Sequence, residues 1–364
     1  MFEIGSLATE ITGFSLAIAS FALTIIFWKK LGRSKWNLVI GRISILIMVQ
    51  VLFLGSIGIA INRSGEFFSS WNDLFGNVTD LTKVAIQPNL LAQLSTKDLT
   101  QAQHTSGGSL IFKKTIKGAE SGISNTVYVV LPPKIAELLK ANPQTPNIGT
   151  DYQIVELFSG YPGVPETWIG SMGGIKTLEK LESSGQIKST IAIIPTINVY
   201  PQHDTECLNF VGGFQVETWL TNDMKTFAQR FLGIDDRPWA TLGYSTGGWC
   251  ATEVAVRHQN QYSSAVSLAG YFKPLFANGV NRNEKAFLTN EYDLVRILNS
   301  APTNLKILII AGKNDRFAWA SAQKFMTSLS PSVSVKLIPI PAGGHNTKTW
   351  IPFENSAFQW INQN

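Results

Sequence analysis

The sequence predicts an α/β fold, with a mostly parallel central sheet flanked by helices, preceded by an N-terminal two-helix transmembrane hairpin. From about residue 153 onward, short apolar runs typical of buried strands alternate with helical patterns, which favours parallel strands joined by helices. Near the N-terminus, residues 11–28 and 43–61 form two runs without a charged side chain. Further on, a Gly-x-Ser-x-Gly stretch at residues 243–247 lies between a predicted strand and a predicted helix.

Residues 1–62 are interpreted as a hairpin with membrane spans at about 8–28 and 38–61. With a rise of about 1.5 Å per residue, each uncharged run is long enough to cross the hydrocarbon core of a bilayer. The turn between them is basic and contains Lys29, Lys30, Arg33, Lys35 and Arg42. By the positive-inside rule this turn is cytoplasmic and the chain after the second span is extracytoplasmic. Two buried core helices are disfavoured because the second run is too uniformly apolar to be amphipathic.

The formal net charge of +5 is largely a property of this hairpin. The first 42 residues contain five of the 30 basic and two of the 25 acidic side chains. Elsewhere the charges nearly balance, and no arginine-rich or aromatic-interleaved patch indicates nucleic acid as a partner. The basic excess therefore predicts membrane topology and no nucleic-acid binding.

Beyond the hairpin, residues 63–108 are interpreted as a juxtamembrane linker or docking segment, and residues 109–364 as one domain large enough for a single core. Its clearest predicted helix, residues 221–231, has Thr221 as the N-cap. Residues 271–300 interrupt the strand–helix alternation as an insertion, whose aromatic side chains either wall a pocket or belong to the core. The predicted strands lie at residues 109–117, 126–131, 153–158, 190–196, 239–243, 264–267, 305–311 and 333–340.

The Gly-x-Ser-x-Gly stretch is typical of a nucleophile elbow, in which the chain turns sharply from a strand into a helix. At such a turn, side chains two positions on either side of the serine would collide, and glycine removes the collision. Gly243 and Gly247 satisfy this requirement on either side of Ser245, which we predict to be a catalytic nucleophile. An ordinary serine in a glycine-rich connection is the alternative interpretation.

The base that would activate Ser245 should follow it in the chain, after an acidic residue. Only His258 and His345 lie downstream of the serine. His258 falls within the helix after the elbow and is interpreted as a surface histidine that projects away from the serine. His345 follows the last predicted strand in a glycine-rich loop, so we predict that it is the catalytic base.

The acid of the set is predicted to be Asp315. It follows the predicted strand at residues 305–311, and active sites of open α/β sheets gather at the carboxyl ends of the strands. There it would fix the imidazole tautomer and stabilise the imidazolium. Asp293 and Glu291 are alternative acids, and a plain turn aspartate is the alternative role for Asp315.

From about residue 109 onward the chain resembles the putative esterase family of α/β-hydrolases. The family includes esterase D-type S-formylglutathione hydrolases, enterochelin esterases and the mycolyltransferases of actinobacterial envelopes, and the likeness is greatest to membrane-anchored actinobacterial members. The resemblance implies the α/β-hydrolase fold and a serine esterase or acyltransferase activity. It is carried by residues 127–133, 154–163, 204–207 and 217–221, the elbow, and the pair Asp315 and His345.

The resemblance also implies an oxyanion hole made of two backbone amides, those of Tyr161 and Thr246. Here the chain departs from the family, because Ser159 stands in the loop where many relatives have His-Gly or Asp-Gly. Backbone donors survive such a change, but substrate contacts made by the usual side chain do not carry over.

The chain has two cysteines, Cys207 and Cys250, and both lie on the predicted exported side. Both positions border the predicted catalytic edge of the sheet, and a nearby pair oxidises outside the cytoplasm. We predict a disulfide between them, with two buried free thiols as the alternative. Soft ligands are too few for a zinc site, and no cofactor is expected.

Together these features predict a membrane-anchored, extracytoplasmic serine esterase or acyltransferase that works through an acyl-enzyme. Its expected partners are the membrane, through two integral spans, and a small-molecule or lipid ester, with envelope lipids or glycolipids suggested by analogy. A catalytically silent binding or scaffold domain with the same fold is the alternative. A peptidase of this fold, which would also turn over amides, is a third possibility.

Overall fold

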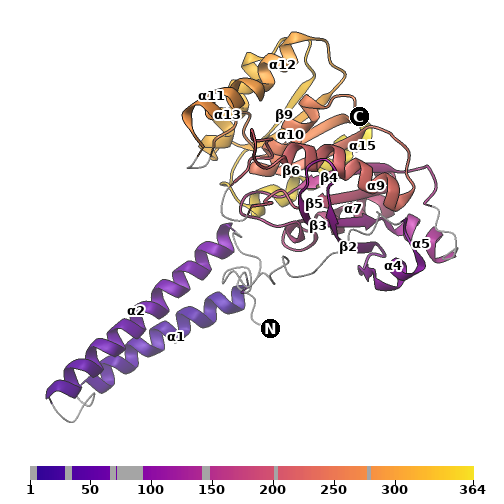
Figure 1. Cartoon of the computed structure of the whole chain (residues 1–364). Coiled ribbons are helices and arrows are strands. Elements are labelled where there is room, and N and C mark those ends of the chain that lie inside the picture. The colour runs from indigo at the N-terminus through magenta and orange to yellow at the C-terminus, as the bar shows by residue number, and fades with distance from the viewer. Residues whose placement is uncertain are drawn as a thin grey trace. The chain divides into compact units, whose positions relative to one another are not determined.

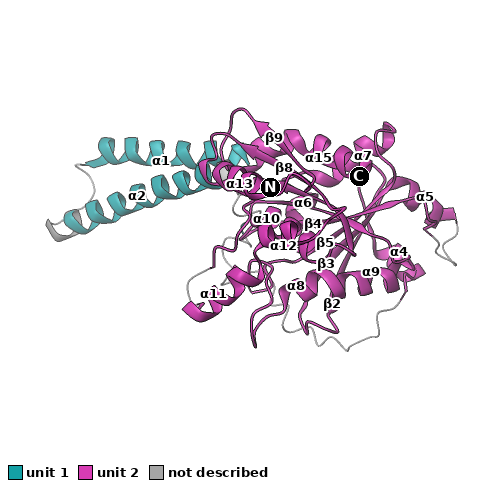
Figure 2. Cartoon of the chain, turned by 90° about the horizontal axis from the view of Figure 1, so that it is seen from above, with its two compact units in different colours: residues 1–85 teal, residues 86–364 magenta. Residues whose placement is uncertain are grey.

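The computed structural model describes residues 6–28, 35–65, 71, 93–141, 148–200, 204–276 and 280–364. The chain divides into two compact units, residues 1–85 and 86–364, which are coloured separately in Figure 2. The first unit contains two helices that pack against each other, α1 (Leu7–Phe27) and α2 (Lys35–Gly65). Gly13 permits a close approach, because a Cβ added there would lie 2.9 Å from Ser56 Oγ.

Both helices are long and apolar enough to cross a membrane. The apolar stretches are Leu7–Phe27 and Val39–Asn62, with mean hydropathies of 1.8 and 2.4. They agree within a few residues with the spans expected from the sequence. Of the basic turn, Lys29, Lys30 and Arg33 lie outside the described residues.

The second unit is built on one sheet, whose strands in the described residues run in the order β1-β2-β3-β5-β4-β6-β7-β8-β9. The strands from β5 to β9 in that order pair in parallel, whereas β1, β2 and β3 extend the sheet in antiparallel fashion. This is the predicted fold class, an α/β-hydrolase fold with a mostly parallel sheet. The strands are β1 (Gln103–His104), β2 (Leu110–Lys117), β3 (Ser124–Leu131), β4 (Gln153–Phe158), β5 (Thr190–Pro195), β6 (Trp239–Tyr244), β7 (Tyr262–Leu268), β8 (Lys306–Gly312) and β9 (Val335–Ile340).

Helices cover both faces of this sheet (Figures 1 and 2), so most strands are apolar on both sides. On one face, α7 (Gly174–Ser183) and α15 (Glu354–Gln363) bury side chains such as Leu178 and Phe358. On the other face, α9 (Met224–Leu232) and α10 (Thr246–Arg257) bury Phe227 and Trp249. The other helices are α4 (Thr96–Gln101), α5 (Pro133–Ala141), α6 (Glu166–Ile169), α8 (Val216–Thr218), α11 (Arg282–Glu291), α12 (Leu294–Ser300), α13 (Arg316–Ser328) and α14 (Thr347–Trp350), with a π-helical turn at Trp219–Asp223 and a 3₁₀ turn at Ile351–Phe353.

The domain begins earlier than the sequence patterns indicated. Gln103 and His104 pair with β2, so the sheet starts inside the segment interpreted as a linker or docking segment, residues 63–108. The helix α4 also belongs to the second unit, and its Ser95 cap and Asp98 form a capping box. The rest of that segment, at residues 66–70 and 72–92, lies outside the described residues.

The expectation that Thr221 caps a helix is wrong. Helical backbone already starts at Val216, and Thr221 lies inside the π-helical turn, where its hydroxyl donates to the carbonyl of Glu217. Threonine binds backbone carbonyls inside helices as readily as it caps them, so its position alone did not locate the helix start.

Candidate active site

Ser245 lies at a sharp turn between β6 and α10. Its backbone has φ 55° and ψ −124°, a conformation that a residue with a side chain adopts only under strain. The Ser245 amide donates to the Leu268 carbonyl at the end of β7, over 2.9 Å. A Cβ on Gly243 would overlap the Gly247 carbonyl, and one on Gly247 would overlap the Phe158 carbonyl. The elbow therefore needs glycine at both positions, as predicted.

His345 and Asp315 meet Ser245 in one hydrogen-bonded chain. His345 Nε2 lies 2.8 Å from Ser245 Oγ, and His345 Nδ1 lies 2.5 Å from Asp315 Oδ2. Asp315 follows β8 and His345 follows β9, and both strands run parallel to β6. Because the carboxyl ends of parallel strands share one sheet edge, these three side chains, 100 residues apart at the extremes, come together.

Asp315 is held as a carboxylate. Burial raises its pKa, but the hydrogen bond and the charge of His345, together with the amide of Ala318, outweigh burial and leave the pKa below its ordinary value. Only 5% of the Asp315 side chain is exposed, against 40% of His345. The inner carboxylate is thus shielded, while the imidazole is partly exposed to solvent.

Aromatic packing supports the imidazole from one side. The ring of Trp350 meets His345 edge to face, with centroids 4.9 Å apart, and also packs against Tyr244 at 5.4 Å. Neither contact was foreseen from the sequence. Trp350 lies only five residues after the histidine, at the end of α14, and this short spacing was the available signal.

The loop after β4 lies against the serine. A Cβ added to Gly160 would lie 3.2 Å from Ser245 Cβ, so the backbone around Tyr161 borders the nucleophile. Ser159 is buried and donates to the Val164 carbonyl over 2.8 Å, so its side chain braces the loop. Asn198 donates to the carbonyls of both Gly160 and Gly163.

The second predicted oxyanion donor, Thr246, is the first residue of α10. Amides in the first turn of a helix have no partner within the helix, so they are available to an anion. Its side chain donates to Asp204 Oδ2 over 3.3 Å, and the Tyr271 hydroxyl lies 3.5 Å from the same Thr246 oxygen. The sequence analysis gave no role to Asp204 or Asn198, although Asp204 lies in the stretch 204–207 that carries the family resemblance.

A disulfide joins Cys207 to Cys250 and attaches the loop after β5 to α10. Next to it, the buried Glu206 accepts a hydrogen bond from the Leu275 amide over 2.6 Å. Burial raises the pKa of Asp204. Burial and the nearby charge of Asp204 together raise the pKa of Glu206 to about 8. The described residues contain no group of three or more His, Cys, Asp or Glu side chains placed to hold a metal ion.

The alternative candidates have other places. His258 is the C-cap residue of α10, where its side chain is 25% exposed and its Nε2 lies 2.7 Å from Glu217 Oε1. Asp293 caps α12 and Glu291 pairs with Arg257. In the insertion, Tyr271, Phe272 and Tyr292 are buried in the core, which favours packing over a pocket wall for these three.

Three comparisons place this fold among known proteins. The model of a family described as "Putative esterase" matches residues 122–352. An uncharacterized protein of Corynebacterium glutamicum is 25% identical over 223 residues, which cover 57% of this chain and 52% of that protein. The match thus spans about half the length of this relative.

Two solved structures share the fold. The S-formylglutathione hydrolase of Agrobacterium tumefaciens has a TM-score of 0.56 at 14% identity, over 72% of this chain and 97% of that one. The fluorophosphonate-binding serine hydrolase F of Staphylococcus aureus has a TM-score of 0.57 at 17% identity, over 70% and 99%. At such identities the likeness is one of fold alone.

Proposed function

Because this chain belongs to the putative esterase family and is a serine hydrolase of the α/β-hydrolase fold, we propose that Ser245, His345 and Asp315 are its catalytic triad. The observation that carries the proposal is the chain of hydrogen bonds from Ser245 Oγ through the imidazole to Asp315, at 2.8 and 2.5 Å. A serine held at the tip of a strained elbow, next to an exposed imidazole on a buried carboxylate, suits nucleophilic attack on an ester.

In the proposed reaction, Ser245 Oγ attacks the ester carbonyl while His345 Nε2 takes the hydroxyl proton. The amides of Tyr161 and Thr246 donate to the oxyanion of the tetrahedral intermediate. When the intermediate collapses, the carbon–oxygen bond to the alcohol breaks and the imidazolium gives its proton to the leaving alkoxide. Water or an acceptor hydroxyl, deprotonated by His345, then attacks the carbonyl carbon of the acyl-enzyme. The bond from that carbon to Ser245 Oγ breaks, and the imidazolium returns its proton to the serine oxygen.

We further propose that the enzyme is anchored in a membrane with its catalytic domain outside the cytoplasm. Support comes from the two apolar helices and from the basic residues between them. A disulfide beside the elbow fits an oxidising compartment. Esters of envelope lipids or glycolipids are the proposed substrates, since a membrane anchor keeps the site close to them.

The test is fluorophosphonate labelling, followed by turnover of short- and long-chain aryl esters by the full-length protein. Ser245→Ala should abolish labelling and lower kcat/KM by at least about 10⁴-fold while the protein stays folded. Ser183→Ala, at an exposed serine of α7, is the matched control and should leave both unchanged. Equal turnover by Ser245→Ala would reject the triad, and no labelling of the folded wild type would favour the silent binding domain.

A further inference from the structure

Most of the exposed large apolar side chains described in the second unit lie in three segments, which follow β5, β7 and β8. Six large hydrophobic side chains lie exposed in the described part of the second unit. One of them, Leu138, lies on α5, whose Leu139 lines a hollow together with Leu110 of β2. The other five are Val211, Phe214, Leu275, Phe287 and Phe317, with exposed fractions between 43% and 72%.

These five belong to segments that contact one another or the site. Phe317 begins α13 just after Asp315, and its ring lies 5.9 Å from Tyr271, whose hydroxyl reaches Thr246. The Leu275 amide binds Glu206, in the loop that the disulfide holds on α10. The exposed Leu275 therefore lies four residues after Tyr271, whose hydroxyl contacts Thr246 at the start of α10.

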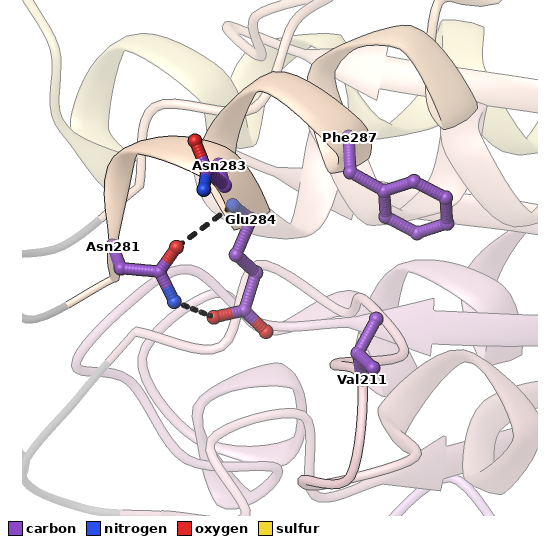
Figure 3. Close-up of a pocket in the computed structure, with 5 residues that line it drawn as sticks. All are labelled: Val211, Asn281, Asn283, Glu284 and Phe287. Carbon is purple, nitrogen blue, oxygen red and sulfur yellow. Dashed lines mark hydrogen bonds between the residues drawn. The ribbon is translucent and has the colours of Figure 1, made fainter.

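Two of the five, Val211 and Phe287 of α11, line one hollow. Val211 lies at the tip of a turn that the hydrogen bond from Phe210 N to Phe214 O closes, so Val211 and Phe214 share one protrusion. Figure 3 shows Val211 and Phe287 at one end of a hollow of about 340 Å³. At its other end Asn281 and Glu284 are hydrogen-bonded to each other.

Exposed cations accompany the apolar side chains. In the same segments, Lys273, Arg282, Lys313 and Arg316 are exposed. Within the described part of the chain, none of these four side chains forms a salt bridge. Two acidic side chains lie near these cations in sequence: Glu284, whose carboxylate binds Asn281, and Asp315, whose carboxylate binds His345.

We propose that this face, defined by Val211, Phe214, Leu275, Phe287, Phe317 and the four cations, docks on the surface of an anionic lipid bilayer. Exposed apolar side chains partition into the headgroup region, and basic side chains beside them bind lipid phosphates. A soluble domain held to the membrane by its own chain meets the bilayer at a high effective concentration, so weak contacts are enough. The inference rests on the proposed membrane anchorage and adds a second contact, made by the catalytic domain itself, with the lipid.

The experiment uses the full chain in nanodiscs of phosphatidylcholine, with or without phosphatidylglycerol. Phe287→Cys provides a free thiol for an environment-sensitive NBD label, because both native cysteines are in the disulfide. Leu138→Cys is the matched control, since the two side chains are similarly exposed, at 53% and 46%. Docking predicts that NBD at position 287 emits at shorter wavelength in anionic discs and is quenched by nitroxide lipids, while NBD at position 138 is not.

A variant with two of the cations removed tests whether these side chains bind lipid phosphates. Arg282→Gln combined with Lys273→Gln should lower the ratio of docked to undocked protein in anionic discs by about fivefold per cation removed. Labels at positions 287 and 138 that respond alike would overturn docking. Docking would also be overturned if the NBD shift at position 287 appeared only with added long-chain ester, because this face would then be an acyl-binding site. A shift that appeared only at high protein density would overturn it too, because the face would then bind a second copy of the chain.

The failure of anchorage has a different signature. If the chain does not co-purify with the discs at all, the proposed membrane spans are wrong and docking falls with them. If it co-purifies and the label at position 287 stays in water, anchorage stands and docking is rejected.

Discussion

Ser245 shows how local strain and charge are arranged at the scale of single residues. Holding a serine at φ 55° costs about 1–3 kcal/mol, which the surrounding strand pairing and the hydrogen bond to Leu268 must offset. The glycines at positions 243 and 247 leave room for carbonyl groups where any side chain would collide. The strained turn therefore holds the Ser245 hydroxyl within 2.8 Å of His345 Nε2.

Replacing Asp315 should separate orientation of the imidazole from proton transfer. Asp315→Asn removes the charge that stabilises the imidazolium and favours the wrong tautomer, so kcat should fall by about 10⁴-fold. His345→Ala should cost more, because it removes the base itself. Steady-state kinetics on an aryl ester compare the two; an Asn variant with wild-type kcat would place the acid elsewhere.

Glu206 should give the protein a pH-dependent stability. Its pKa is raised above the ordinary 4.5 to about 8 by burial, so between these values the folded state holds a proton that the unfolded state has lost. The free energy of unfolding contributed by this group therefore falls as pH rises from 4.5 to 8, by at most about 1.4 kcal/mol per pH unit. Denaturation of Glu206→Gln in the same pH range should show a flatter profile than the wild type.

Other buried acids have raised pKa values as well, including Glu156 and Glu253. Each of them also makes the free energy of unfolding fall as the pH rises. The difference between the wild type and Glu206→Gln isolates one group. Parallel profiles would mean that Glu206 does not titrate in this range.

At the scale of elements, three strands and two loops position the residues of the site. The strands β6, β8 and β9 bring the three residues of the proposed triad to one edge, and the backbone of the loop after β4 lies against the serine. The loop after β5 braces this arrangement twice, through Asn198 to the loop of Gly160 and through the disulfide to α10. Elements distant in the chain thus hold the proposed oxyanion hole.

Removing the disulfide tests this bracing. Cys207 and Cys250 are 43 residues apart, and closing a loop of that length stabilises a fold by about 4 kcal/mol in the chain-entropy model. Cys207→Ser with Cys250→Ser should lower the free energy of unfolding by that order. Calorimetry or denaturant titration, with dithiothreitol-treated wild type as the matched sample, measures it. An unchanged stability would show that the crosslink constrains little.

At the scale of the whole molecule, an apolar helical hairpin and an α/β-hydrolase domain form two separate units of one chain. The charges between the helices are expected to set its orientation. Replacing Lys29, Lys30, Arg33 and Lys35 by Gln should lower the fraction of chains with the domain outside, because the positive-inside bias is lost. A C-terminal alkaline phosphatase fusion reports that fraction.

Arg substitutions at Lys29, Lys30 and Lys35 keep the charge and form the control. Full phosphatase activity in the Gln variant would mean that another feature orients the chain.

Patterns local in the sequence determined the strands, the glycine-flanked elbow and the two apolar helices, because each depends on spacing within a few residues. The candidates Ser245, Asp315 and His345 followed from their order after strands, since the parallel sheet gathers carboxyl ends. Tertiary structure alone placed Asn198, Asp204 and Glu206 beside the site, added β1 to the sheet, and paired His258 with Glu217. Except for β1, which pairs with the neighbouring β2, these contacts join segments about 40 residues apart in the chain, and no local period encodes which distant side chain will meet which.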